Sequence, residues 1–216
     1  MPFDLEEEAL YASGVQEAGL LGEYKSELGC LYREFEREMK PSPDYVRIAR
    51  ALFYWLWAQK PARHEHGGSY RLNEVIGLQL NKQSETVGNC LGLTLLYNCL
   101  LRRAGIVAGA VHLENAFGKG PHVLSTLMIQ DSTIDIENSL PQGFDYKGHR
   151  DDPSRRVWGD RELVADIYLS RGNDYFELGN YDEALASYDA AIGLNPRYER
   201  AALNRAIVVD KMGVKG

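Results

Sequence analysis

Three cysteines are the residues of this 216-residue chain best suited to covalent chemistry, and one of them stands out by its position. Cys90 follows Gly88 and Asn89 and precedes the helical apolar run "LGLTLLYNCLL". The pattern predicts that Cys90 is the first residue of a helix. A helix N-terminus carries partial positive charge and free N–H groups, which stabilise a thiolate and the oxyanion of a tetrahedral intermediate. Cys90 is therefore a candidate nucleophile and not only a small buried hydrophobic residue.

A histidine and two carboxylates follow this cysteine in the order that an activated thiol requires. His122 opens a predicted strand, and Asp135 and Glu137 lie on the next predicted strand. Two positions apart on a strand, the carboxylates are expected to point to the same face. An imidazole can take the thiol proton and a carboxylate can orient the imidazole, so these residues have the parts of a Cys-His-acid triad.

The other cysteines and histidines are weaker candidates for catalysis or metal binding. Cys99 lies about 180° around the helix from the candidate nucleophile, so the two cannot share a site, and Cys30 has no catalytic context. His112 lies in an earlier strand and is interpreted as structural. We expect His64 and His66 to be solvated in a loop, since no cysteine or carboxylate set at zinc spacing accompanies them. The sequence thus predicts no metal and no cofactor.

Hydrophobic periodicity predicts the elements that must position these residues. Steps of three and four predict helices over residues 1–40, 43–60 and 90–104. Ser42 is the expected N-cap of the second helix. The period then changes to two, which predicts strands over 106–114, 122–129 and 133–138, with a turn at 130–132. Helices followed by a small antiparallel sheet make an α+β fold.

The chain from about residue 50 to 140 resembles the transglutaminase-like superfamily of papain-type cysteine enzymes. The resemblance is carried by a Gly-x-Cys motif that opens a helix at Cys90, by "RRAGI" at 102–106 and by His122 at the start of a strand. Val123-Leu124 departs from the small residue and tryptophan that often follow this histidine in the family. No acidic cluster resembles the calcium sites of animal transglutaminases.

This resemblance implies a papain-like fold and assigns roles to the candidate residues. Cys90 is the implied nucleophile and His122 the implied base. The interval from the histidine favours Glu137 over Asp135 as the third member, and both stay open. The implied activity is that of a cysteine hydrolase or acyltransferase acting on an amide or peptide bond, and Gln83 is a further candidate for an oxyanion donor.

Residues 165–196 resemble a tetratricopeptide repeat. The matching residues are Tyr168, Gly172, Tyr175, Gly179, Ala184, Tyr188, Ala191 and Pro196, whereas Arg171 stands where the family usually has leucine. Residues 199–213 look like the first helix of a second repeat. Because about three repeats are needed for a stable array, this segment must pack on the rest of the chain, on a protein partner or on another copy in a homodimer.

Composition and charge limit the classes of partner. Apolar residues make up 44% and charged residues 25%, which is ordinary for a globular protein. The formal net charge of −7 argues against nucleic acid and anionic membranes as partners. An acidic N-terminus, the lack of a long apolar run and three cysteines without a CxxC pair predict a cytoplasmic protein.

The sequence predicts two parts, a transglutaminase-like α+β domain over residues 1–150 and a TPR-like helical segment over 160–216, with a loop or linker rich in Pro and Gly from about 140. The favoured function is that of a cysteine enzyme with a peptide or protein substrate, because the three residue types of a triad occur in the right order. The alternative is a non-catalytic protein-interaction module, which the missing aromatic residue after His122 supports.

Overall fold

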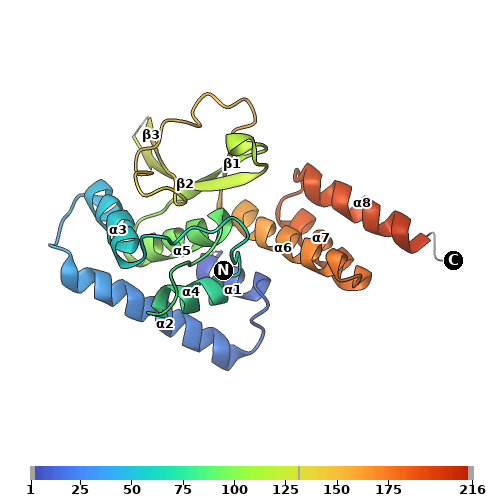
Figure 1. Cartoon of the computed structure of the whole chain (residues 1–216), viewed down its shortest axis with the longest axis horizontal. Helices are drawn as coiled ribbons and strands as arrows, with labels where there is room; N and C mark the ends of the chain where they lie inside the picture. Colours follow the sequence, from blue (N-terminus) through green and yellow to red (C-terminus); the bar gives the residue numbers. More distant parts are fainter. Residues whose placement is uncertain (1–2, 131, 214–216) are drawn as a thin grey trace.

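The computed structural model describes residues 3–130 and 132–213 (Figure 1). Its helices are α1 (Leu5–Ala12), α2 (Ala18–Glu38), α3 (Tyr45–Gln59), α4 (Leu72–Leu80), α5 (Cys90–Arg103), α6 (Asp160–Glu177), α7 (Tyr181–Leu194) and α8 (Glu199–Gly213). Its strands are β1 (Gly109–Leu113), β2 (His122–Ile129), β3 (Ser132–Ile136) and β4 (Arg156–Trp158), and a 3₁₀ turn, η1 (Ala116–Gly118), precedes β2.

The four strands form one antiparallel sheet in the order β3-β2-β1-β4. Helix α5 packs against β2, and the other N-terminal helices surround α5 on that side of the sheet (Figure 1). Helices α6, α7 and α8 follow as a separate layer, of which α6 contacts α1, α5 and β1. The predicted mixture of helices, a small antiparallel sheet and a C-terminal helical segment is confirmed.

Two of the predicted boundaries that position the candidate residues are confirmed. Cys90 is the first residue of α5, and β2 spans His122–Ile129 as expected. The predicted turn at 130–132 includes residue 131, which lies outside the described residues. The expected N-cap Ser42 is wrong, because Asp44 caps α3 by accepting hydrogen bonds from the Val46 and Arg47 amides.

The segment from 140 to 155 is a folded loop, which is the first of the two predicted alternatives, loop or linker. Phe144 and His149 in this loop are buried, and Tyr146 N donates to the Asp135 carbonyl at 2.9 Å. The loop leads into β4, which the sequence analysis did not predict and which pairs with β1 from Ala110 to His112. The loop therefore covers part of the sheet and brings its own side chains close to the end of β3.

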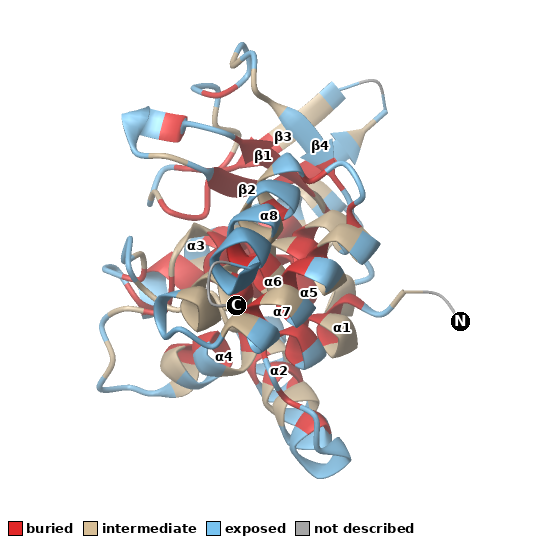
Figure 2. Cartoon of the chain, turned by 90° about the vertical axis from the view of Figure 1, so that its right-hand side faces the viewer, coloured by how far each residue is buried: buried red, intermediate tan, exposed pale blue. Residues whose placement is uncertain are grey.

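One hydrophobic cluster runs from Leu5 in α1 to Val208 in α8. Figure 2 shows buried residues gathered where α5 and α6 meet the sheet. Polar contacts reinforce this junction, since Arg102 pairs with Asp160 at 2.5 Å and the Arg171 guanidinium donates to the Ala12 carbonyl at 2.8 Å. The division into domains at 150–160 thus stays a prediction, because the two parts share a core.

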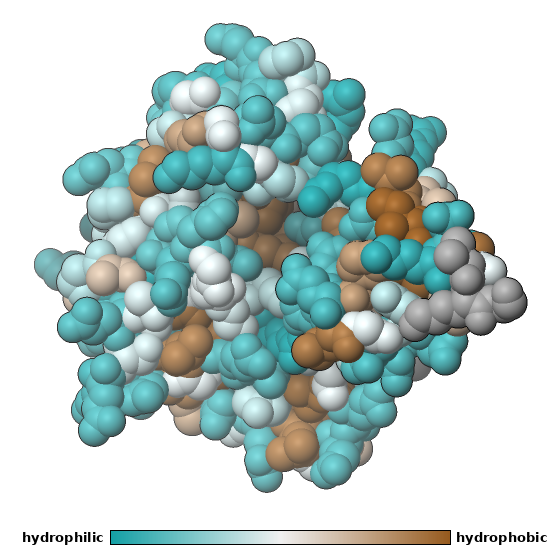
Figure 3. Space-filling model, turned by 45° about the vertical axis from the view of Figure 1, so that its right-hand side comes forward, coloured by the Kyte–Doolittle hydropathy of each residue, from teal (hydrophilic) through white to brown (hydrophobic). Residues whose placement is uncertain are grey.

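Helix α8 exposes several apolar side chains to solvent. Its exposed apolar side chains are Leu203, Ile207, Val209 and Met212. Figure 3 shows hydrophobic side chains at the surface over this end of the molecule. Among the described residues, no helix is long and apolar enough to cross a membrane.

Candidate active site

Cys90 is held at the start of α5 by close packing of residues 88–92 against the backbone at Ser69. The Asn89 side chain caps the helix by accepting from Gly92 N at 3.1 Å, and Asn89 N donates to the Ser69 carbonyl at 3.0 Å. The backbone at Ser69 passes so close that a Cβ on either Gly88 or Gly92 would overlap its carbonyl oxygen. The glycines on both sides of Cys90 are thus required for this packing, which leaves the thiol half-buried.

The His122 ring lies between the thiol and a buried carboxylate. His122 Nε2 is 2.7 Å from Glu137 Oε2, and the ring and the Cys90 thiol line the same cavity. Because Nε2 is engaged by the carboxylate, Nδ1 is the ring nitrogen left for the thiol. The structure therefore brings together three of the four predicted residues, in the order thiol, imidazole and carboxylate.

The pKa values of His122 and Glu137 are shifted in opposite directions, each toward its charged form. Burial lowers the pKa of His122, but its hydrogen bonds to Cys90 and Glu137 and their negative charges raise the pKa to about 10. Burial likewise raises the pKa of Glu137, but the hydrogen bond and charge of His122 hold that pKa well below its usual range. The imidazolium and the carboxylate thus stabilise each other.

Glu137 is fixed by its own neighbours. Its Oε1 accepts from the Ser139 amide at 3.0 Å and from the Ser139 hydroxyl at 2.5 Å. Its amide donates to the Gly143 carbonyl at 2.9 Å, and a Cβ on Gly143 would overlap the Glu137 backbone. The side chain is fully buried. Both oxygens of the carboxylate are therefore oriented before any substrate arrives.

Asp135 takes a different direction from Glu137. Strand β3 ends at Ile136, so the alternation expected along a strand does not extend to Glu137. The Asp135 carboxylate accepts two hydrogen bonds from Arg155, at 2.8 and 2.9 Å, and one from Thr126 at 2.9 Å. The structure does not bring Asp135 to the His122 ring. Its contacts instead tie β3 and β2 to the loop that precedes β4.

A buried polar network connects α5 to the sheet below the site. Asn138 donates to Ser125 Oγ at 2.8 Å, and Ser125 donates to the Asn98 side chain at 2.7 Å. Asn98 in turn donates to the Gly109 carbonyl, and Thr94 donates to the Val123 carbonyl. A buried network of this kind is stable only when its groups stay hydrogen-bonded. These bonds therefore hold α5, which carries Cys90, at a fixed distance from β2, which carries His122.

The thiol opens onto a cavity of about 400 Å³. Its lining includes His64, His66, Phe117, Lys119 and His122. We call this space the thiol cavity. Of the two loop histidines expected to be solvated, His66 is exposed and His64 is half-buried, and pairing of 63–65 with 87–88 brings both to the cavity. Gln83 is exposed elsewhere and does not line the cavity.

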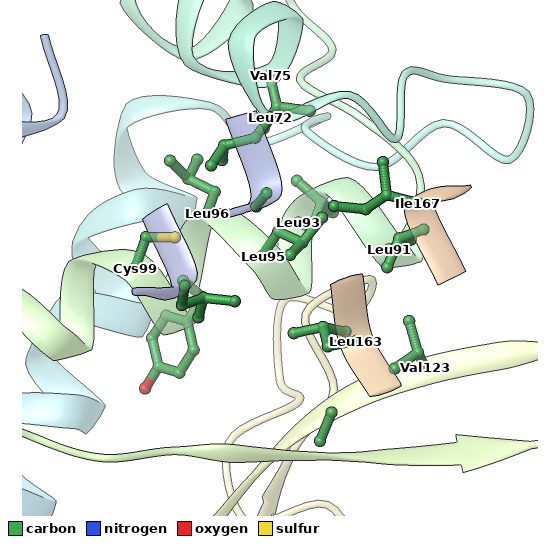
Figure 4. Close-up of a cluster of buried hydrophobic side chains, with 14 of the residues drawn as sticks. Leu72, Val75, Leu91, Leu93, Leu95, Leu96, Cys99, Val123, Leu163 and Ile167 are labelled. Carbon is green, nitrogen blue, oxygen red and sulfur yellow. The ribbon is translucent and has the colours of Figure 1, made fainter. Parts of the chain in front are cut away.

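The remaining predicted residues lie away from the thiol cavity. Cys99 is fully buried, among core residues such as Leu96 (Figure 4), and burial raises the pKa of its thiol. Cys30 is exposed on α2. His112 stacks on Trp158 at 4.1 Å, as its structural interpretation requires.

A third histidine, His149, approaches the same carboxylate and was missed in the sequence because it lies in an irregular loop. Its Nε2 is buried without a hydrogen bond, 3.6 Å from Glu137 Oε2. His122, Glu137 and His149 place their ligand atoms within 4.8 Å of one another, a set that could hold a metal ion. However, zinc ligands about 2.1 Å from one ion keep their atoms about 3 Å or more apart. The direct 2.7 Å contact of His122 with Glu137 therefore favours a hydrogen bond over a shared metal.

Comparison with known proteins gives one match. Residues 165–198 match the tetratricopeptide repeat, which covers most of α6 and all of α7. No curated protein and no solved structure was found to match the chain. The predicted repeat is thus confirmed over one unit, and such repeats commonly bind protein partners through the surfaces that they form by stacking.

Proposed function

We propose that the chain is a cysteine hydrolase or acyltransferase acting on an amide or peptide bond through Cys90, His122 and Glu137. The observation that carries the proposal is the His122 ring, which lines one cavity with the Cys90 thiol and is 2.7 Å from a buried carboxylate. The resemblance of the segment around these residues to transglutaminase-like enzymes supports the same assignment. The proposed fold of this part is accordingly papain-like.

The chemistry follows from the positions of the three groups. His122 takes the Cys90 proton, and the thiolate attacks the carbonyl carbon of the substrate, so that a C–S bond forms and the carbonyl oxygen becomes an oxyanion. In the first turn of α5 the Asn89 side chain takes the N–H of Gly92, whereas the N–H groups of Cys90 and Leu91 have no carbonyl partner within the helix and lie at this position. They stabilise the oxyanion.

Collapse of the intermediate completes the transfer. The C–N bond breaks, His122 donates its proton to the leaving amine, and a thioester of Cys90 remains. Water or a second amine then gives a proton to His122 and attacks the thioester, which releases the acid or the new amide and restores the thiol. Glu137 keeps its charge throughout and orients the imidazole.

Alkylation by iodoacetamide, followed for each cysteine by mass spectrometry, tests the proposal. At about pH 6 an ordinary thiol is almost fully protonated and reacts slowly. We expect fast reaction of Cys90 at this pH, and its loss in His122→Ala. Cys30 is the exposed control and Cys99 the buried one. If Cys90 reacts no faster than Cys30, the enzyme assignment fails.

The second candidate function is that of a protein-interaction module, and the match of residues 165–198 to the tetratricopeptide repeat favours it. A groove between α6 and α8 is lined by Asn173, Phe176 and Asn204, and α8 has exposed apolar side chains. In this case the Cys90 thiol would have no catalytic role. An inert Cys90 in a protein that captures a partner would favour this alternative.

A further inference from the structure

The walls of the thiol cavity carry cationic and hydrogen-donating side chains. They are His64, His66, Lys119 and His122, and no aspartate or glutamate is among the described residues that line the cavity. Glu137, the acid of the site, is fully buried behind His122. This lack of acidic side chains in the lining contrasts with the formal net charge of −7 of the whole chain.

A short closed loop fixes Lys119 on one wall. Ala116 N donates to the Gly120 carbonyl and Lys119 N donates to the Ala116 carbonyl, both at 2.9 Å. The Asn115 side chain accepts from Gly120 N at 3.0 Å. Between these anchors Phe117 adopts a φ of 54° and packs edge-on against His122, with ring centroids 5.6 Å apart. A non-glycine residue in this conformation, next to a candidate active site, marks a loop that the surrounding contacts hold in a strained shape.

The segment with His64 and His66 is fixed by pairing with the segment that precedes Cys90. Glu65 N donates to the Gly88 carbonyl at 3.0 Å, which places His64 and His66 on either side of this bond. Burial lowers the pKa of His64, and the charges of His122, His66 and Lys119 lower it further, against the opposite effect of Glu137. His64, His66, Lys119 and His122 line the same cavity, so their side chains can contact one small ligand.

The charge of Lys119 is not neutralised by the protein. Among the described residues Lys119 has no ion pair, unlike Lys25, which contacts Asp4 and Glu7. An exposed amine at the rim of the cavity, with imidazole side chains in the same lining, suits a carboxylate better than a neutral group, because ionised acceptors make stronger hydrogen bonds.

We propose that the thiol cavity selects substrates that carry a carboxylate next to the amide that Cys90 attacks, with Lys119 and the His64–His66 wall as the carboxylate-binding groups. This inference rests on the proposed function and names its substrate class, an acidic peptide or amide. The carboxylate can belong to an acidic side chain or to a chain end, and both present the same group to the cavity.

A pair of small alkylating agents measures this preference without a known substrate. Iodoacetate and iodoacetamide differ in one charge, and the ratio of their rates at Cys90 reports the potential in the cavity. We expect Lys119→Gln to lower the iodoacetate:iodoacetamide ratio about two- to fivefold and Lys119→Glu to lower it more, at low salt. His66→Gln should lower it in the same direction. Lys82→Glu is the matched control, because this exposed lysine does not line the cavity.

Matched inhibitors then locate the carboxylate. Peptidyl chloromethyl ketones ending in Glu or Gln compare an acidic with a neutral side chain, and succinyl-alanine and acetyl-alanine chloromethyl ketones compare an acidic with a neutral chain end. Faster inactivation by the acidic member of either pair, weakened in Lys119→Glu, supports the proposal and identifies the source of the carboxylate.

Equal rates within both inhibitor pairs, or a ratio that Lys119→Glu changes no more than Lys82→Glu does, would overturn the proposal. The ratio can be read even where Cys90 reacts as slowly as an ordinary thiol. Slow iodoacetamide labelling at about pH 6 would count against the proposed function, whereas an unchanged ratio with fast labelling would count against the carboxylate preference alone.

Discussion

The carboxylate of Glu137 reaches the His122 ring from just beyond the last residue of β3, with 2.7 Å between Oε2 and Nε2. This contact commits one ring nitrogen to the carboxylate and leaves the other for Cys90. Ser139 and the Gly143 carbonyl hold Glu137 in turn. The reactivity of the thiol therefore depends on residues after β3 that lie far from Cys90 in the chain.

Replacing Glu137 should lower the reactivity of the Cys90 thiol more than replacing Asp135. In Glu137→Gln the charge that raises the pKa of His122 is lost, and an opposite charge at contact distance is worth about 1–3 pKa units. We expect Cys90 alkylation at mildly acidic pH to slow by about tenfold or more. Asp135→Asn is the control. It should reduce stability through the lost Arg155 pair but leave the alkylation rate close to wild type, and equal slowing in both variants would contradict the assignment.

A single methyl group at Gly143 should disturb the same carboxylate. The Cβ of Gly143→Ala would overlap the Glu137 backbone, so the loop must shift. We expect a loss of about 1–3 kcal/mol in the free energy of unfolding, typical of an overpacked site, together with slower Cys90 alkylation. Gly193→Ala in α7 meets nothing within 4 Å and should not destabilise the protein. Urea denaturation of both variants measures the difference.

The buried His112 should make the fold sensitive to mild acid. Burial lowers the pKa of His112 from 6.5 to about 4, so between these values the unfolded chain binds a proton that the folded chain excludes. Stability therefore falls as the pH falls from 6.5 toward 4, by at most about 3 kcal/mol. His112→Gln should flatten this part of the curve of unfolding free energy against pH. An unchanged slope would show that His112 does not titrate in this way.

Chelation should leave the thiol chemistry unchanged. His122, Glu137 and His149 could hold a metal ion, but the direct contact between the first two is shorter than a shared ion allows. We therefore expect Cys90 alkylation to be the same with and without EDTA, whereas added zinc should slow it by separating His122 from Glu137. Loss of reactivity in EDTA would show instead that a metal holds the site together.

The local elements that carry the candidate triad could be predicted from the sequence. The Gly-Asn-Cys start of α5 and the alternation of β2 are set by capping and side-chain periodicity, which are local. The orientation of Glu137 was harder to predict from the sequence, because β3 stops one residue earlier. The hydrogen bond of Glu137 N to the Gly143 carbonyl, and not strand alternation, directs its side chain.

Features that depend on long-range packing were missed. Strand β4 has three residues and exists only through its pairing with β1. His149 lies in an irregular loop, and His64 reaches the site through a bridge to Gly88. None of these positions has a periodic pattern. The departure at Arg171 from the leucine of the repeat finds its reason only in the structure, where the guanidinium binds the Ala12 carbonyl.

The most direct test of the central claim is the ionisation of Cys90 itself, read as the ultraviolet absorbance of its thiolate in the difference between wild type and Cys90→Ser. The predicted result is a clear thiolate signal at about pH 6, where an ordinary thiol gives almost none, and its disappearance when the same difference is taken in a His122→Ala background. A protonated Cys90 at this pH, or a thiolate that persists without His122, would contradict the proposed ion pair.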